Sequence, residues 1–345
     1  MSARDPVHAR RLTAQLLSGA PARDPVDVAE RLLAIQGQDP RGARLAVRAR
    51  STGVSAADID RALTEERSLL ITWCNRGTLH LVRSEDYPLL QQLTTPPLRT
   101  SNTTRLTQEG LDAAATERGL GVIERALSAD GPLTRNELAG RLKSAGVAVA
   151  GQALVQLLFR AAIDGLVVRG PMAGRHHAYV LVRDWLPRPR PIPRDQALAE
   201  LARRYLAGHG PANERDLARW AGLPLRDAQA GLKAIASQLR SAPGGLVDLA
   251  SRRRAAPLPR SRLLGAFEPL LLGWNSREPV LGEHAARVVT GGIFRGFALA
   301  GGRAVALWRL QGTRVALEPF TELTSEEHAA LQRDGEALTA FLGVG

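Results

Sequence analysis

The sequence is poor in cysteine and in long apolar runs. Cys74 is the one cysteine among 345 residues, so the chain can form neither an internal disulfide nor a metal cluster held by several thiolates. No stretch supplies the roughly 18 consecutive apolar residues that a membrane-spanning helix needs. The first residues, MSARDPVHARRL, also lack the apolar core of a signal peptide. We therefore expect a soluble, cytoplasmic protein in which Cys74 belongs to a buried strand.

Lysine is nearly absent, and arginine carries the positive charge. Lys143 and Lys233 are the only lysines among 46 basic residues, which face 34 acidic ones and give a net charge of +12. A composition rich in Ala, Arg, Gly and Leu is typical of a GC-rich genome, so the preference for arginine is not by itself a sign of phosphate binding. The excess of base over acid does favour a surface that binds a polyanion.

Signatures of cofactor and metal chemistry are missing as well. The sequence has no Walker loop and no HExxH pattern, and GGIFRG lacks the strand-then-helix context of a nucleotide-binding fingerprint. The adjacent His176 and His177 would point to opposite faces of a strand, which makes them a poor metal pair. We therefore expect neither a cofactor nor a metal.

A short internal sequence repeat is the clearest organising feature. Residues 131–139 read GPLTRNELA, and residues 210–218 read GPANERDLA. Each copy places a capping residue, Thr134 or Asn213, after Gly-Pro and an acid three positions later. This spacing predicts a capping box at the start of a short helix.

The surroundings of both copies indicate winged helix-turn-helix units. Around the first copy, three short amphipathic helices precede two alternating strands, LVVRGPMAGRHHAYVLV, that would form the wing. The second copy shows three helices followed by SQLRSAPGGLVDLA, which would form its hairpin. The N-terminal region fits a looser third copy. From about residue 257, short alternating strands punctuated by glycine predict an antiparallel, barrel-like β-domain, and TSEEHAALQRDGEALTAFL predicts a final helix with a capping box.

The predicted class is therefore α+β, with tandem winged helix-turn-helix units and a C-terminal antiparallel β-barrel-like domain. Alternating prolines indicate an extended spacer between the second and third units. The predicted parts are a first winged-helix unit (1–110), a second (111–186), the Pro-rich linker (187–194), a third winged-helix unit (195–250), the β-domain (251–322) and the C-terminal helix (323–345).

The stretch AIQGQDP places Gln36 and Gln38 directly after an apolar helical run. Pro40 disfavours helix at the preceding residue, so we expect the helix to end near Ile35 and both amides to project to one side. A glutamine cannot act as a base at neutral pH, but it donates and accepts hydrogen bonds. Two convergent amides can hold one water molecule. The alternative is a pair of solvated polar residues at a helix end.

Basic and aromatic residues form further candidate contacts. In RGTLHLV, alternation would place Arg76, Thr78 and His80 on one strand face, with Trp73 just upstream. Such a row suits contact with phosphates or a groove, although an ordinary exposed sheet face explains it too. The wing offers Arg169, Arg175, His176 and His177, which would contact DNA or be merely solvated. The run SRRRAAPLPRSR is either a polyanion contact or only a basic loop.

Several of these stretches together carry a family resemblance. The order VAERLLAIQGQDP, TWCNRGTLHLV, AYVLVRDWLP, FEPLLLGWNSREPVL and GGRAVALWRL resembles the AlkZ/YcaQ-type winged-helix DNA glycosylases over residues 8–342. The resemblance implies tandem winged helices with a C-terminal β-barrel that form a concave DNA-binding surface. It also implies excision of bulky alkylated purines and interstrand crosslinks, in some members as self-resistance to DNA-alkylating antibiotics.

The family's catalytic Gln-x-Gln or Gln-x-Asp motif falls on Gln36 and Gln38, with Gly37 where the family usually has an aliphatic residue or alanine. The resemblance implies a glycosylase that binds double-stranded DNA with alkylated purines. Because no lysine lies near the motif to form a Schiff base, we predict a monofunctional enzyme, and we expect a monomer that does not bind membranes. A hairpin near Arg295 and Arg303, or the wing, would enter a groove. Two alternatives remain: a non-catalytic winged-helix regulator, which leaves the paired glutamines unexplained, and a protein-interaction scaffold.

Overall fold

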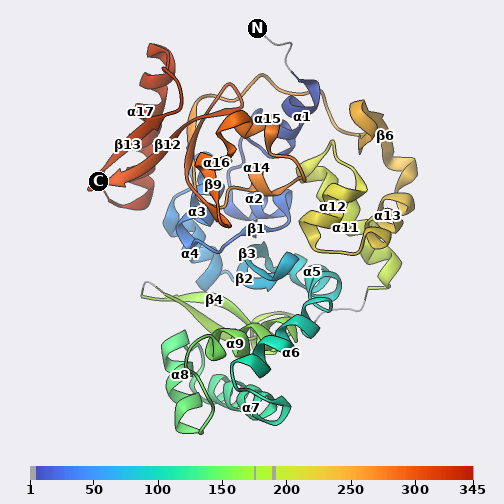
Figure 1. The fold of residues 1–345 in the computed structure, drawn as a ribbon, viewed down its shortest axis with the longest axis vertical. Coiled ribbons are helices and arrows are strands. Elements are labelled where there is room, and N and C mark those ends of the chain that lie inside the picture. Colours follow the sequence, from blue (N-terminus) through green and yellow to red (C-terminus); the bar gives the residue numbers. More distant parts are fainter. Residues whose placement is uncertain (1–4, 175, 189–191, 345) are drawn as a thin grey trace. The chain divides into compact units, whose positions relative to one another are not determined.

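The computed structural model describes residues 5–174, 176–188 and 192–344, drawn as a ribbon in Figure 1. The chain divides into two compact units. Unit 1 combines the chain up to Ile59 with the chain from Arg194 onward, and unit 2 runs from Asp60 to Pro193. Residues 1–110 thus contribute to both units. Helices and small antiparallel sheets alternate throughout, so the chain is of mixed α and β class, and no sheet of the described residues closes on itself.

Unit 2 contains the three helices and the following two strands that the sequence predicts around residues 131–139, together with further helices and strands. They are β2 (Leu69–Cys74), the short η1 turn (Asn75–Gly77), β3 (Thr78–Arg83), η2 (Ser84–Asp86), α5 (Tyr87–Thr94), α6 (Leu98–Gln108), α7 (Ala113–Asp130), α8 (Arg135–Ser144), α9 (Ala153–Ile163), β4 (Val167–Ala173), β5 (His176–Leu181) and α10 (Val182–Trp185). Helix α4 (Ala56–Thr64) contains the boundary between the units.

The sheet of unit 2 runs in the order β3-β2-β4-β5. Every residue of β2 is buried, including Cys74, which confirms the predicted core strand. Burial raises the pKa of the Cys74 thiol to about 12, so this thiol stays protonated and unreactive at neutral pH. Helix α8 opens with the predicted capping box, in which the Thr134 and Glu137 side chains each accept a hydrogen bond from the other's backbone N–H.

The segment around the predicted linker is partly helical. Asp184 and Trp185 lie in the one-turn helix α10, and Arg194 is already the first residue of α11. The extended chain is therefore shorter than residues 187–194, because proline restricts helix only at and just before its own position. Pro189 and Pro191 lie outside the described residues.

Unit 1 is built from both ends of the chain. Its N-terminal elements are α1 (Pro6–Ala14), α2 (Pro25–Leu32), β1 (Ile35–Gln36) and α3 (Pro40–Arg48). Its later elements are α11 (Arg194–His209), α12 (Glu214–Ala221), α13 (Leu225–Ala234), η3 (Ala236–Gln238), β6 (Leu239–Ala242), η4 (Pro243–Gly245), β7 (Leu246–Leu249), β8 (Arg262–Leu264), α14 (Pro269–Leu272), α15 (Glu278–Leu281), η5 (Gly282–His284), α16 (Ala285–Val288), β9 (Val289–Thr290), β10 (Ile293–Phe294), β11 (Phe297–Ala300), β12 (Arg303–Gln311), β13 (Arg314–Pro319) and α17 (Ser325–Leu342).

The C-terminal part of unit 1 is an open sheet of four strands in the order β13-β12-β11-β8. Helix α17 packs on it, and Leu331 and Leu338 share a buried cluster with Leu263 of β8. The prediction of strands throughout this region is wrong for residues 269–272 and 285–288, which form α14 and α16. Glu268 accepts the Leu270 N–H at 3.2 Å as an N-terminal cap, and Pro269 favours the first helical position.

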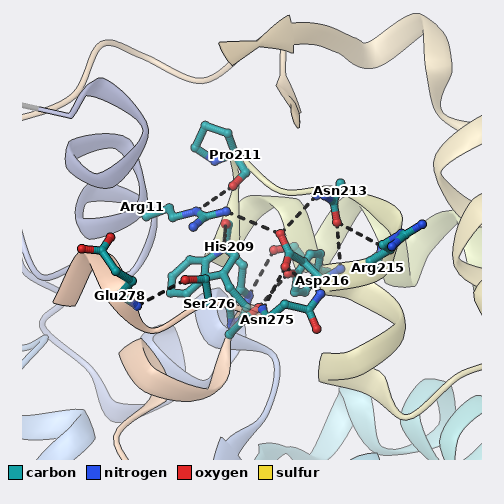
Figure 2. Close-up of polar contacts among 12 residues, drawn as sticks. Arg11, His209, Pro211, Asn213, Arg215, Asp216, Asn275, Ser276 and Glu278 are labelled. Atoms are coloured by element: carbon teal, nitrogen blue, oxygen red, sulfur yellow. Dashed lines mark hydrogen bonds and ion pairs between the residues drawn. The ribbon is translucent and has the colours of Figure 1, made fainter. Parts of the chain in front are cut away.

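A buried polar cluster joins the N-terminal helix to the middle of the chain (Figure 2). The Arg11 Nε donates to the Pro211 carbonyl at 2.9 Å, and its guanidinium lies 3.5 Å from the Asp216 carboxylate. The Arg11 guanidinium also lies 4.7 Å from the centre of the Trp274 ring. Asp216 accepts the Asn275 N–H at 2.9 Å. Because Arg11 and Asp216 are both buried and have protein partners, this cluster holds α1 and α12 together.

Among the described residues, no helix is long and apolar enough to cross a bilayer. Nor do three His, Cys, Asp or Glu side chains gather as metal ligands would anywhere in that part of the chain.

Candidate functional site

The two glutamines lie in the short connection between α2 and α3 of unit 1. Helix α2 ends at Leu32, three residues earlier than predicted, because Leu33 adopts φ +63° and ψ −41°. Leu33 still donates its N–H to the Ala29 carbonyl at 2.8 Å, and the chain then runs extended through Ile35 and Gln36. A bulky residue with positive φ costs about 1–3 kcal/mol, and such strain persists only where the surroundings enforce it.

The two amides have different surroundings. Gln36 is 7% exposed, whereas Gln38 is exposed to solvent. Gly37 between them is buried, and its φ is not positive. Gly37 therefore does not use the positive-φ conformations open to glycine, and what distinguishes it is the lack of a side chain at a buried position. A buried amide beside an exposed one is an arrangement that can hold a water molecule at the protein surface.

Helix α3 fixes the C-terminal side of this connection. Asp39 caps α3 by accepting the Arg41 N–H at 3.0 Å, and Pro40 occupies the first helical position. Gly42 lies against the backbone of residue 266, since an added Cβ would come within 2.3 Å of the Ala266 carbonyl oxygen. The loop with the two glutamines is thus anchored by close backbone packing immediately after the motif.

A buried ion pair secures the far end of α3. Arg50 and Glu268 are both fully buried and in direct contact. Arg50 also donates to the Ala46 carbonyl of α3 and to the Gln15 Oε1, each at 2.9 Å. These bonds tie α3 to α1 and to the segment before α14, so the position of the motif depends on a charged network inside the core.

In unit 2, the expected row of Arg76, Thr78 and His80 is only partly formed. Arg76 lies in the turn between β2 and β3 with φ +59°, and β3 begins at Thr78. Arg76 is therefore not on the strand face, because the Asn-Arg-Gly turn interrupts the alternation that the sequence suggested. Thr78 and His80 do lie on β3.

His80 is buried and uncharged. Burial, and secondarily the positive charge of Arg76, lower the pKa of His80 to about 3. Its Nδ1 lies 2.9 Å from the Thr78 carbonyl oxygen, so this nitrogen must carry the proton and Nε2 is the acceptor. His80 therefore contributes no positive charge at neutral pH, and Arg76 is the cation of this turn.

The structure brings Trp73 and Arg169 together. The Arg169 guanidinium carbon lies 4.6 Å from the Trp73 ring centre and 4.8 Å from the Tyr179 ring centre. Strand register explains this, because Arg169 pairs with Ile71 on one side and with Tyr179 on the other. The Arg169 Nε makes no hydrogen bond to any residue that the structure describes. The two rings fix the orientation of the guanidinium without neutralising its charge, as a carboxylate would. The guanidinium can therefore bind an anion.

The other candidate residues lie at the ends of hairpins. His176 is exposed and His177 half-buried at the start of β5, whereas Arg175 lies outside the described residues. In unit 1, the exposed Arg295 lies between β10 and β11, and the exposed Arg303 begins β12.

Two residues of unit 2 were missed by sequence reasoning. Tyr179 completes the aromatic clamp on Arg169, and only the pairing of β4 with β5 reveals it. Asn75 is fully buried, and its Oδ1 and Nδ2 have no hydrogen-bond partner among the described residues. A buried unsatisfied amide beside Arg76 is costly, which marks it as a candidate for binding water or substrate. No local signal in the sequence identifies it.

A family model described as DNA glycosylase AlkZ-like matches residues 29–341. The chain belongs to this family. It is therefore an enzyme of the DNA glycosylase class, a hydrolase of DNA repair whose partner is DNA. The match begins seven residues before Gln36 and includes both units.

Two comparisons with individual AlkZ-like proteins agree with this assignment. The interstrand DNA cross-link repair glycosylase of Streptomyces sahachiroi is 27% identical over 370 aligned residues, which cover 98% of this chain and 96% of that protein. The solved structure of the Streptomyces sahachiroi DNA glycosylase AlkZ shares the fold, with a TM-score of 0.77 at 24% identity, 98% coverage of this chain and 96% of the other.

Proposed function

We propose that this AlkZ-like glycosylase hydrolyses the N-glycosidic bond of bulky N7- or N3-alkylated purines in double-stranded DNA, with Gln36 and Gln38 holding the attacking water. The observation that carries the proposal is a neutral amide pair, one buried and one exposed, in a strained connection inside the region of the family match. Neither amide titrates, so the chemistry must suit a substrate that needs no general acid.

Alkylated purines have that property. An N7- or N3-alkylated base carries positive charge, so its glycosidic bond is already weakened and the base leaves without being protonated. The sugar then develops oxocarbenium character at C1′. Two amide carbonyl oxygens can orient a water molecule below C1′ and stabilise the developing cation. In this mechanism the buried Gln36 fixes the geometry, and Gln38 presents the water to the substrate.

Charged and aromatic residues supply the DNA contacts in this proposal. Trp73, Arg76 and Thr78 would contact the lesion or adjacent phosphates, and the clamped Arg169 would bind a phosphate. His80 would contribute packing and a neutral hydrogen-bonding group, not a positive charge. His176 and His177 of the wing, with Arg175, would add contacts beyond this cluster.

A second hairpin, at residues 289–294, suits insertion into a groove. Ile293 near its tip is 63% exposed, and the two turn glycines precede it. An exposed aliphatic side chain at a hairpin tip is typical of residues that wedge between base steps, with Arg295 and Arg303 placed to meet the backbone. Because a bulky adduct does not fit a tight pocket, we propose that the lesion is read in the duplex and is not flipped out.

The proposed architecture assigns winged-helix units to residues 111–186 and 195–250, a looser one to 1–110, and the linker, β-domain and final helix to 187–194, 251–322 and 323–345. We propose that the protein is a monomer. We also propose that it leaves an abasic site, because the chain has two lysines, Lys143 and Lys233, and neither lies near Gln36 in sequence. Borohydride trapping of a covalent protein–DNA adduct would contradict this monofunctional chemistry.

We extend the proposal to unhooking of interstrand crosslinks, the activity named for the Streptomyces sahachiroi relative. Self-resistance to a DNA-alkylating natural product is the biological role proposed with it. A biosynthetic cluster for such a compound beside the gene would support that role.

The decisive experiment incubates the protein with a duplex that contains one N7-alkylguanine and measures alkali-labile strand breaks in single-turnover conditions. Gln36→Ala and Gln38→Ala are expected to lower the excision rate by at least tenfold while duplex binding is kept. The matched control is Gln332→Ala, an exposed glutamine of α17 whose loss should leave excision unchanged. Wild-type protein that produces no breaks but a sequence-specific footprint on undamaged DNA would establish the regulator instead.

A further inference from the structure

Unit 1 contains a cavity of about 380 Å³ in which every charged residue of the lining is an arginine. It lies where the end of α1, the end of α2, the end of α11 and the segment after β7 meet. Among the described residues that line it, the charged ones are Arg31, Arg252 and Arg253, and Ser18 and Ser251 supply hydroxyl groups. At ~30 Å³ per water molecule, the cavity holds about a dozen waters, which is ample for a hydrated phosphate group.

Among the arginines that line the cavity, Arg31 differs in its side-chain contacts. It belongs to the last turn of α2, four residues before the extended segment with Gln36. Its side chain has neither a hydrogen bond nor an ion pair with any residue in the described part of the chain. Burial lowers the pKa of Arg31 and the positive charge of Arg252 lowers it further, while the neighbouring Glu30 carboxylate offsets only part of this shift. A half-buried arginine that faces a second arginine is stabilised by an anion placed between them.

Arg252, which lines the same cavity, is held in place by hydrogen bonds. Its Nε donates to the buried Asp248 at 2.7 Å, and its Nη2 donates to the carbonyls of Leu206 and Ala207. Arg252 therefore cannot move away from Arg31. Arg253 is exposed at the rim. Of the three arginines in SRRR, Arg252 is structural, Arg253 lies at the cavity mouth, and Arg254 is exposed and does not line the cavity.

The backbone around the cavity is equally constrained. An added Cβ at Gly208 of α11 would come within 2.3 Å of the Arg31 carbonyl oxygen, so α2 and α11 are in direct backbone contact here. Arg31 is presented from a closely packed helix end and not from a loose loop. The site is thus preorganised, which lowers the entropic cost of binding an anion.

We infer that Arg31, with Arg252 and Arg253, forms a subsite for a phosphate group, which in this DNA glycosylase is a backbone phosphodiester of the duplex. The Arg31 guanidinium can direct paired N–H donors at phosphate oxygens, whereas Arg252 uses its Nε and Nη2 on protein acceptors and offers only Nη1. The identity of the ligand as DNA rests on the proposed function, whereas the anion site itself rests on the cavity. Since Arg31 is on the same helix end that leads to the glutamines, a phosphate bound there would set the register of the strand relative to the motif.

The test measures binding of an undamaged 20-base-pair duplex by fluorescence anisotropy across a series of KCl concentrations. Each phosphate that is neutralised contributes about −0.9 to the slope of log K against log salt concentration. Arg31→Ala is therefore expected to make the slope less steep by about 0.9 and to weaken binding about eightfold at 0.1 M salt. Arg31→Lys should retain most of the slope. The matched control, Arg314→Ala, removes an exposed arginine at the β12–β13 turn and should keep the wild-type slope.

A second arm distinguishes DNA from a free phosphate compound. Thermal unfolding is compared in 20 mM inorganic phosphate and in chloride of equal ionic strength, for wild-type protein and Arg31→Ala. A stabilisation lost in the variant, together with an unchanged DNA slope, would support the anion site and assign it to a small phosphate-bearing molecule. An unchanged slope and no phosphate effect would overturn the site. These two experiments do not measure excision. A failure of the phosphate subsite can therefore be distinguished from a failure of the proposed glycosylase activity, which the excision assay with Gln36→Ala tests.

Discussion

The buried contact between Arg50 and Glu268 leads to the sharpest stability prediction. Both side chains are completely buried, and Arg50 also donates to Ala46 and Gln15, whereas its Nε has no hydrogen-bond partner among the described residues. Glu268→Gln keeps the size and one acceptor oxygen but removes the negative charge. The Arg50 guanidinium is then left as an uncompensated charge in the core.

The magnitude follows from that geometry. Removing one partner of a buried ion pair costs about 3–5 kcal/mol, and because the glutamine oxygen still accepts a hydrogen bond, we expect about 3 kcal/mol for Glu268→Gln. Glu268→Ala should cost about 1 kcal/mol more, because the Leu270 N–H also loses its cap. A domain is stable by only about 5–15 kcal/mol, so either loss is a large fraction. The double variant Arg50→Met with Glu268→Leu should lose less than either single change.

Urea unfolding at pH 7.5 measures these differences as shifts in the midpoint at constant m-value. The control is Glu66→Gln, which breaks the Arg61–Glu66 pair at 2.9 Å with both side chains about half exposed, and which should cost under about 1 kcal/mol. If Glu268→Gln is no more harmful than Glu66→Gln, or if the double variant is worse than the sum of the singles, the pair does not act as a desolvated charge network and the anchoring of α3 needs another explanation.

Three further predictions concern pH, packing and the aromatic clamp. Burial lowers the pKa of both His80 and His209 to about 3, so the unfolded chain takes up protons below about pH 6.5 that the folded chain does not. Stability should therefore be complete above pH 6.5 and fall as the pH drops, by up to about 1.4 kcal/mol per pH unit for each histidine, and His209→Gln should flatten the urea-measured slope. Gly42→Ala should destabilise by about 1–3 kcal/mol in thermal unfolding, whereas Gly140→Ala, in an open part of α8, should be neutral or slightly stabilising. Arg169→Lys keeps the charge but loses the planar fit between two rings, so duplex affinity in anisotropy titrations should fall by about 0.5–2 kcal/mol. An affinity equal to that of wild type would refute the proposed role of Arg169 in DNA binding.

Local patterns in the sequence predicted local structure well. The three capping boxes, Thr134 with Glu137, Asn213 with Asp216 and Thr324 with Glu327, are all present, because each depends on residues within one helical turn. The predicted hairpin at 237–250 forms as β6 and β7 for the same reason. Alternation also predicted strands in the C-terminal region, but alternation does not encode whether a sheet closes, and the sheet is open.

Contacts between residues far apart in the chain could not be predicted from the sequence. Arg11 meets Asp216 across 205 positions, and Trp73 meets Arg169 through strand register that periodicity alone cannot fix. The early end of α2 depends on positive φ at Leu33, a conformation that local propensity argues against. The resemblance assigned Gln36 and Gln38 a role that stays a prediction, whereas the contrast between a buried Gln36 and an exposed Gln38 required the fold.

That contrast bears on why amides would serve where other glycosylases use a carboxylate. A carboxylate at the position of Gln36 would be almost completely removed from water, and burial would raise its pKa and favour the neutral acid, which no longer offers a charge to the sugar. An amide keeps its carbonyl dipole at every pH and bears no ionic desolvation cost. Since a cationic purine departs without a proton donor, the proposed reaction loses little by giving up an ionised group. A neutral motif thus suits a substrate that brings its own charge, and ordinary uncharged purines would be excised poorly by the same site.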